Sequence, residues 1–270
     1  MKRFAQKIFT RIGLAGNYRP QITTQVDARK YLDEIHDFFN LSGQEVQDEH
    51  DQYLTFSERK GYKTMLGETK TLCVEEAFLI YLAAQITNPR TFCEIGTQYG
   101  KSTRRILDIF NELTLHPTSY CFDITKEIKF VTDDEIEFRL RDLTNDFEHE
   151  VLETLSPELI FLDAHPYALL KTIIQGFVTW SCTHPAILAV HDCSPGLYRS
   201  KMLIPKDRPS SISSHSGLWE RHVLAEIFQV PNEQLDDLQT PTHHLKIFST
   251  PHGLALIAPK TLLGMAGDRQ

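Results

Sequence analysis

Apolar residues in the last two thirds of the chain alternate between short continuous runs and helix-like spacing. The runs at 91–95, 119–122, 137–140, 159–162 and 186–190 each predict a strand. Apolar positions at helical spacing predict helices over 102–113 and 169–180, and 148–155 can form another short helix. Short apolar strands separated by helices are typical of a parallel sheet that is covered on both faces. We therefore expect an α/β fold.

The flanks of this series have patterns of their own. Before it, apolar residues from Leu72 recur at helical spacing until Asn88-Pro89, which should end that helix. After it, residues 218–228 predict a helix, with Trp219 expected in the core and stacking on a substrate as the alternative. Residues 245–258 predict two strands around a His252-Gly253 turn. We expect the histidines of this hairpin to lie at the surface: His243, His244 and His252.

The first 70 residues are polar and charged and carry few strand signals. Residues 31–39 form the pattern of a short amphipathic helix, with Tyr31 and Ile35 on its apolar side. We predict two regions: an N-terminal helical or irregular extension over 1–70, and one α/β domain over 71–270. The basic segment 1–14 predicts a helix that docks on the body or on a second copy in a homodimer, with peripheral membrane contact as the alternative.

Composition and charge limit the classes of function and the cellular compartment that fit this chain. A net charge of -8 argues against a nucleic-acid partner bound through a broad positive face. The five cysteines form no CxxC pair, so a reducing compartment, the cytoplasm, is expected. Cys93 and Cys121 lie in apolar runs and should be buried. No apolar run approaches the roughly 20 residues that span a bilayer.

The segment Glu94-Ile-Gly-Thr-Gln-Tyr-Gly-Lys-Ser-Thr103 connects a predicted strand to a predicted helix. Gly96 allows a sharp turn with close backbone approach, and Gly100 allows close packing of the helix. The helix N-terminus near Ser102 favours a carboxylate. Gln98 stands where a dinucleotide-binding loop would have its second glycine, so the ligand is expected to lack a diphosphate.

Acidic residues follow the next two strands. Asp123 ends the second strand, where a carboxylate can bind a ribose diol, and Asp142 follows the third strand, where it can face an adenine edge. Either residue could instead cap a helix or pair with a neighbouring arginine. Ligands of open α/β sheets bind at these carboxyl ends, so the two aspartates and the glycine turn should share one crevice.

Two further strands end in groups that can bind metals. Asp163 and His165 follow the fourth strand, and His191-Asp192 follows the fifth. Adjacent parallel strands lie about 5 Å apart, so Asp163, His191 and Asp192 should converge. Carboxylates with an imidazole suit a divalent cation, which would lower the pKa of a bound hydroxyl. The alternative is that these side chains only cap a helix or support each other.

The segment Glu94–Thr103 resembles motif I of class I S-adenosylmethionine (SAM)-dependent methyltransferases. It is especially similar to the metal-dependent O-methyltransferases of the catechol and caffeoyl-CoA type, and to the group of macrocin O-methyltransferases and cephalosporin-hydroxylase-like proteins. The similarity covers roughly residues 72–260. It implies a Rossmann-like sheet with a C-terminal antiparallel hairpin, and O-methylation of a small hydroxylated acceptor such as a sugar or secondary metabolite.

The resemblance also implies roles for individual residues. Those assigned to SAM are Glu94, Gly96, Thr97, Gly100, Ser102, Asp123, Asp142 and Asp163, with Glu94, Gly96 and Ser102 at the methionine end, Asp123 at the ribose and Asp142 near the adenine. Those assigned to a metal are Asp163, His191 and Asp192. The cation would be Mg²⁺ or Mn²⁺, with Fe²⁺ or Zn²⁺ as alternatives because His191 stands where the family has a carboxylate.

The residue available as general base also differs from the one that the family uses. Catechol-type enzymes carry a lysine shortly after the first aspartate, and Pro166 stands at that position here. We therefore predict His165 or His191 as the general base, with Asp192 completing the catalytic set.

Two alternatives to methyl transfer stay open. A cephalosporin-hydroxylase-like oxygenase could use the same strand ends around iron, and a non-catalytic cofactor-binding or interaction protein could use the N-terminal extension as its contact surface. The basic loop 194–217 predicts a lid over an acidic or phosphorylated acceptor, with solvated charge as the alternative.

Overall fold

The computed structural model describes residues 27–62, 72–194 and 219–266. The predicted basic segment 1–14 lies outside these residues, as does the predicted basic loop after Ser194. Within the described residues, no helix combines the length and apolar character that crossing a bilayer requires.

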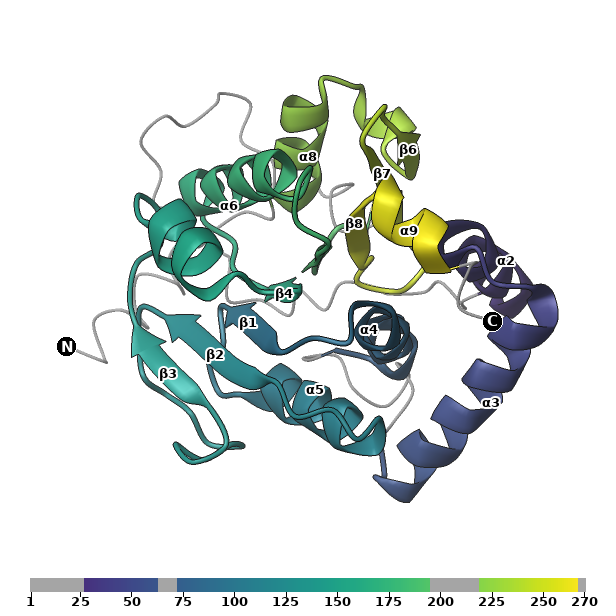
Figure 1. Cartoon of the computed structure of the whole chain (residues 1–270), viewed down its shortest axis with the longest axis horizontal. Coiled ribbons are helices and arrows are strands. Elements are labelled where there is room, and N and C mark those ends of the chain that lie inside the picture. The colour runs from purple at the N-terminus through teal and green to yellow at the C-terminus, as the bar shows by residue number, and fades with distance from the viewer. Residues whose placement is uncertain (1–26, 63–71, 195–218, 267–270) are drawn as a thin grey trace, which may run out of the picture.

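An eight-stranded sheet runs through the centre of the molecule in the order β3-β2-β1-β4-β5-β8-β7-β6 (Figure 1). The first five positions hold the parallel strands β1 (Thr91–Ile95), β2 (Thr118–Asp123), β3 (Glu137–Leu140), β4 (Leu159–Leu162) and β5 (Ile187–Val190). Strand β8 (Ala255–Pro259) pairs antiparallel with β5 and β7 (His243–Ile247), and β6 (Asp237–Gln239) forms the far edge. This Rossmann-like sheet with an inserted antiparallel strand confirms the predicted fold class.

Helices cover both faces of the sheet (Figure 1). One face carries α2 (Ala28–Phe39), α3 (Gly43–Arg59), α4 (Val74–Thr87), α5 (Lys101–Glu112) and α9 (Lys260–Ala266). The other face carries the π-helix η1 (Glu148–Glu153), α6 (Tyr167–Trp180) and α8 (Glu220–Phe228), and the short 3-10 helix η2 (Asn232–Gln234) precedes β6.

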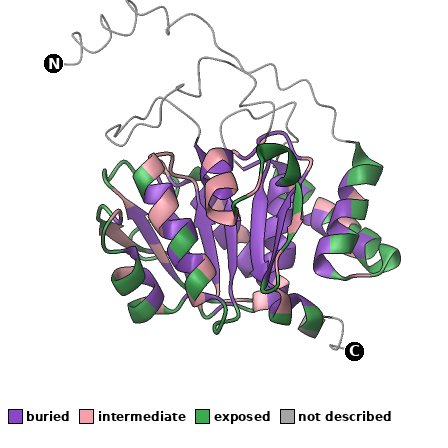
Figure 2. Cartoon of the chain, turned by 90° about the horizontal axis from the view of Figure 1, so that it is seen from above, coloured by how far each residue is buried: buried purple, intermediate pink, exposed green. Residues whose placement is uncertain are grey.

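Successive strand residues point into two different cores. In β4, Leu159 and Phe161 pack with α4 and α5, whereas Ile160 and Leu162 pack with α6. Every residue of β4 and β5 is buried, and Figure 2 shows the buried colour filling the sheet while exposed residues face outward on the helices. Burial on both faces explains why these strands appear in the sequence as continuous apolar runs.

The end of α4 follows from its sequence. Helix α4 is apolar on all sides, so it is buried, and it ends where Asn88 adopts a left-handed conformation (φ 43°) before Pro89. Asparagine tolerates that conformation, and the residue after it cannot continue the helix, because proline lacks the N–H. The predicted helix end is confirmed.

The histidines of the C-terminal hairpin correct one expectation. His243, His244 and His252 are all buried, with exposed fractions of 1%, 5% and 6%. The surface prediction was wrong for His243 and His244 because β7 is an interior strand, flanked by β8 and β6, and for His252 because it is bonded to the buried Glu76. His243 Nε2 lies 2.9 Å from Ser181 Oγ, and His244 Nε2 lies 2.8 Å from Asp237 Oδ1.

Candidate active site

The carboxyl ends of the parallel strands are joined by a ladder of backbone hydrogen bonds. Gly96 N donates to Phe122 O at 2.9 Å, Asp163 N to Ile95 O at 2.9 Å, and His191 N to Leu162 O at 3.0 Å. The register therefore continues past the ends of β1, β4 and β5. It brings the residues that follow these strands to one rim of the sheet.

A cavity of about 1450 Å³ opens at this rim. Its lining includes six of the residues predicted to bind the cofactor, namely Gly96, Thr97, Ser102, Asp123, Asp142 and Asp163, and also His165. Glu94, Gly100, His191 and Asp192 are not part of this lining. The structure thus brings most of the sequence-predicted residues to one crevice, and His191 contacts one of them, Asp163.

Gly96 is required for a reason that the sequence did not reveal. Its φ is +92°, and a Cβ at this position would lie 2.2 Å from the backbone oxygen of Asp163. The backbone therefore approaches closely to the end of β4 at this position. Gly100, with φ +78°, packs against the side chain of Val131 (3.2 Å from an added Cβ) and begins α5.

Glu94 is fully buried and points to the start of α5. Ser102 Oγ donates to its Oε1 at 2.6 Å, and the Thr103 hydroxyl donates to Oε2. Burial raises the pKa of Glu94 to about 7. In this structure Glu94 holds the turn to the start of α5 through these two bonds.

Asp123 and Asp142 hold their own loops. Asp123 accepts hydrogen bonds from Gln98 N (2.8 Å) and Thr125 N (3.0 Å), which connects the end of β2 to the glycine turn. Asp142 accepts from the amide (2.9 Å) and hydroxyl (2.6 Å) of Thr144, and these bonds lower its pKa. Both carboxylates face the cavity and keep acceptor capacity for a ligand.

Asp163, His191 and Asp192 form a compact cluster. One ligand atom from each lies within 4.8 Å of the others. His191 Nδ1 is 3.3 Å from Asp163 Oδ1 and 3.5 Å from Asp192 Oδ1. Asp192 adopts a left-handed backbone (φ 62°), a conformation that is uncommon outside glycine and that often marks functional sites.

The charges of this cluster depend on one another. Although burial opposes a charge on the ring, Asp192, Asp163 and Glu76 raise the pKa of His191 well above its usual value. Burial similarly opposes ionisation of Asp163, and His191 nevertheless lowers its pKa. The pKa of Asp192 is raised, chiefly by burial. The three side chains are therefore electrostatically coupled, with the imidazole between two carboxylates.

His165 joins the cluster to helix α8. Its Nδ1 lies 2.7 Å from Glu220 Oε1, and its Nε2 lies 3.9 Å from Asp192 Oδ2. Burial opposes protonation, but the bond to Glu220 prevails and raises the pKa of His165 to about 9. The role of His165 as general base stays a prediction.

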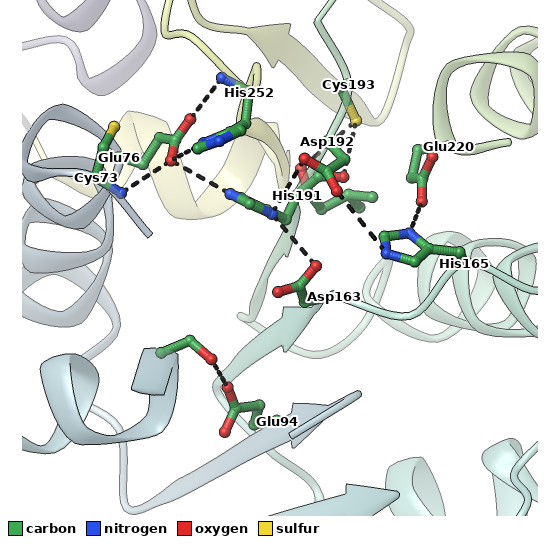
Figure 3. Close-up of polar contacts among 12 residues, drawn as sticks. Cys73, Glu76, Glu94, Asp163, His165, His191, Asp192, Cys193, Glu220 and His252 are labelled. Carbon is green, nitrogen blue, oxygen red and sulfur yellow. Dashed lines mark hydrogen bonds and ion pairs between the residues drawn. The ribbon is translucent and has the colours of Figure 1, made fainter. Parts of the chain in front are cut away.

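Sequence reasoning missed three residues that complete the site: Glu76, Glu220 and His252. Figure 3 shows them beside His165, His191 and Asp192, from Glu76 on α4 to Glu220 on α8. The available signal was the pair Glu75-Glu76 in the first turn of a helix that is otherwise mostly apolar, and of the two only Glu76 is fully buried. Such a buried charge needs partners, which only the fold identifies.

No protein-family model matches this chain, and no curated protein matches it. Several solved structures are similar to this chain. One is a methyltransferase from Podospora anserina bound to S-adenosylhomocysteine (SAH), at 12% identity and TM-score 0.47, over 78% of this chain and 88% of the other. This chain is also similar to an O-methyltransferase from Bacillus cereus in complex with SAH, at 13% identity and TM-score 0.44, over 78% and 90% of the two chains.

A third solved structure is the O-methyltransferase TomG from Streptomyces achromogenes, involved in tomaymycin synthesis and in complex with SAM. It is 14% identical with TM-score 0.41, over 78% of this chain and 89% of the other. These likenesses concern the fold alone, in which five parallel strands are followed by the antiparallel β8, β7 and β6.

Proposed function

We propose that this chain is a SAM-dependent methyltransferase that acts on a hydroxyl group of a small molecule. The observation that carries the proposal is the shared cavity: the glycine turn after β1 and the aspartates at the ends of β2, β3 and β4 all line it. These residues come from four separate strand ends. Their convergence at the carboxyl edge supports one extended ligand that crosses the sheet.

The residues that line the cavity fit the successive parts of a SAM molecule, from its carboxylate to its adenine ring. The amides of the turn at the start of α5 would hold the carboxylate, and Asp123 would hold the ribose diol. Beside Asp123, the cavity is lined by Ile124 and Phe130, which are large apolar side chains with exposed fractions of 55% and 47%. Exposed apolar surface at a cavity wall suits the faces of an adenine ring.

A divalent cation fits the neighbouring cluster. Asp163 and Asp192 offer carboxylate oxygens, and His191 Nδ1 faces both of them, so an ion there would take the place of the Nδ1 proton. When bound, such an ion would lower the pKa of an acceptor hydroxyl. His165, which lines the cavity next to this cluster, would face the acceptor and orient it by donating a hydrogen bond.

Binding of S-adenosylhomocysteine (SAH) to Asp123→Ala tests the cofactor site. We expect calorimetry to give an affinity about 10- to 100-fold below wild type, because the loss of a charged acceptor costs about 1.5–3 kcal/mol. Asp134→Ala, which removes an exposed carboxylate outside the cavity, should bind SAH like wild type. Equal affinity of the two variants would remove Asp123 from the ribose role.

Methyl transfer itself is tested with methyl-labelled SAM and a panel of hydroxylated acceptors. We expect products that gain the mass of a methyl group. The histidine in the cluster favours one competing activity, oxidation at bound iron, in which products would gain the mass of an oxygen atom. Tight SAH binding without any methylated product would instead favour a non-catalytic cofactor-binding protein.

A further inference from the structure

Glu76 is a fully buried carboxylate at the edge of the candidate metal cluster, on the first turn of α4. Its two oxygens meet five hydrogen-bonding groups. Oε1 accepts from Thr250 Oγ1 (3.1 Å) and His252 N (3.0 Å). Oε2 lies 3.1 Å from Cys73 N, 3.1 Å from His252 Nδ1 and 3.2 Å from His191 Nε2.

The contact between Glu76 and His191 determines which ring nitrogen of His191 carries a hydrogen and which one faces the candidate metal site. An ionised carboxylate only accepts hydrogen bonds, so the hydrogen between the two groups must be on Nε2 of the imidazole. With Nε2 as donor, Nδ1 is the ring atom left to face Asp163 and Asp192, at 3.3 Å and 3.5 Å from their oxygens. In Figure 3 the ring lies between Glu76 on one side and the two aspartates on the other.

We propose that Glu76 is a positioning residue of the cation site, holding His191 in the Nε2–H tautomer so that its Nδ1 lone pair points at the ion. This inference rests on the metal site proposed above and extends it to helix α4. A histidine that binds a metal commonly donates its other ring N–H to a carboxylate, which fixes the ring orientation.

Glu76 also holds the β7–β8 turn through Thr250 and His252, so a purely structural role must be distinguished. The chain offers a matched control. Glu34 on α2 is another buried carboxylate, with an exposed fraction of 8%, and it holds the same hairpin. It accepts hydrogen bonds from Ser249 N (2.8 Å) and Ser249 Oγ (2.7 Å), and among the described residues it has no hydrogen bond with His191.

Titration of the full-length chain with Mn²⁺, followed by electron paramagnetic resonance, measures the ion directly. We expect wild type to bind Mn²⁺ and His191→Ala to lose binding. Glu76→Gln should weaken binding by about 10- to 100-fold, the range typical of partners that orient a ligand. Glu34→Gln should bind Mn²⁺ like wild type, although both variants lower the melting temperature.

The tautomer provides a readout that needs no change at Glu76. In protein with ¹⁵N-labelled histidines and bound Zn²⁺, the His191 resonances, assigned by their loss in His191→Asn, should show a protonated Nε2 and a metal-bound Nδ1. The opposite arrangement in wild type would overturn the proposal even if Glu76→Gln failed to fold.

The remaining outcomes separate the two proposals. Failure of wild type to bind Mn²⁺ would overturn the metal site and the positioning role together. Binding that depends on His191 but is equal in Glu76→Gln and Glu34→Gln would overturn the positioning role alone. Cys73, Glu76 and His252 also lie within 4.8 Å of one another. A loss of Mn²⁺ binding in Cys73→Ser would therefore move the ion to that group and overturn the positioning role.

Discussion

At the scale of single residues, Glu94 shows how burial makes the stability of the fold depend on pH. Its folded-state pKa is about 7, against an ordinary value of 4.5. Between these values the folded protein holds a proton that the unfolded chain has released. The stabilising effect of that proton is fully present below pH 4.5 and is lost as the pH rises through about 7.

We therefore expect Glu94→Gln to flatten the pH dependence of unfolding. The free energy of unfolding of wild type, relative to that of the variant, should fall by about 3 kcal/mol between pH 4.5 and pH 8. Urea denaturation across this range measures both curves. Parallel curves would mean that Glu94 keeps an ordinary pKa in the folded protein.

Gly96→Ala tests the close approach between the glycine turn and the end of β4. A methyl group at φ +92° would meet the Asp163 carbonyl oxygen, so we expect the free energy of unfolding to fall by more than about 2 kcal/mol. Gly43→Ala is the control, since an added Cβ there meets nothing within 4 Å at the start of α3. Equal stability of the two variants by urea denaturation would contradict the clash.

Residue-level chemistry was only partly predictable from the sequence. The sequence placed Asp163, His191 and Asp192 together because strand ends in a parallel sheet share an edge, and backbone register is regular. It did not find Glu76, whose partners lie 115 and 176 residues further along the chain. It also missed the bond between His165 and Glu220 that raises the histidine's pKa, because no periodic pattern encodes that contact.

At the scale of elements, helix α2 connects the N-terminal region to the main core. Phe38 packs against Phe248, which follows β7, with ring centroids 5.5 Å apart, and against His244 at 4.8 Å. Residues of α2, α3 and the sheet belong to one apolar cluster. The division at residue 70 remains a proposal, and we expect the regions on its two sides to unfold together.

Phe38→Ala should lower the free energy of unfolding by about 3–5 kcal/mol, the cost of removing a buried phenylalanine. Because α2 shares its core with the sheet, denaturation should remain a single transition, monitored by circular dichroism and by tryptophan fluorescence. Leu140→Ala, at a side chain that is 63% exposed, should leave stability nearly unchanged. A separate early transition in wild type would show that the N-terminal region folds independently.

Elements with strong patterns were predicted to within a few residues. The strand limits 91–95, 137–140 and 159–162 agree with β1, β3 and β4, and the predicted helix at 169–180 is α6, which begins two residues earlier. Strand β6 and helix α9 were not predictable from the pattern of apolar residues. Strand β6 has three half-buried or exposed residues at the sheet edge, so it lacks the apolar run that made the central strands visible.

At the scale of the whole molecule, the proposed function requires a cavity for the cofactor and a separate charged cluster beside it. Exhaustive chelation of divalent ions should therefore abolish methyl transfer while SAH binding, measured by calorimetry, persists. Addition of Mg²⁺ or Mn²⁺ should restore turnover, because only the acceptor step uses the ion. Unaltered turnover after chelation would argue that Asp163, His191 and Asp192 stabilise the fold only.

The contact between Gly96 and Asp163 matters for any attempt to redesign this protein. The glycine turn at Gly96 would hold SAM, and the end of β4 at Asp163 would hold the metal ion. The backbones of these two segments are in contact and leave no space for a methyl group. A shift of either segment must displace the other, so the two halves of the crevice cannot be engineered independently. A library aimed at new acceptors would best keep both backbones fixed and vary only side chains on the far wall of the cavity.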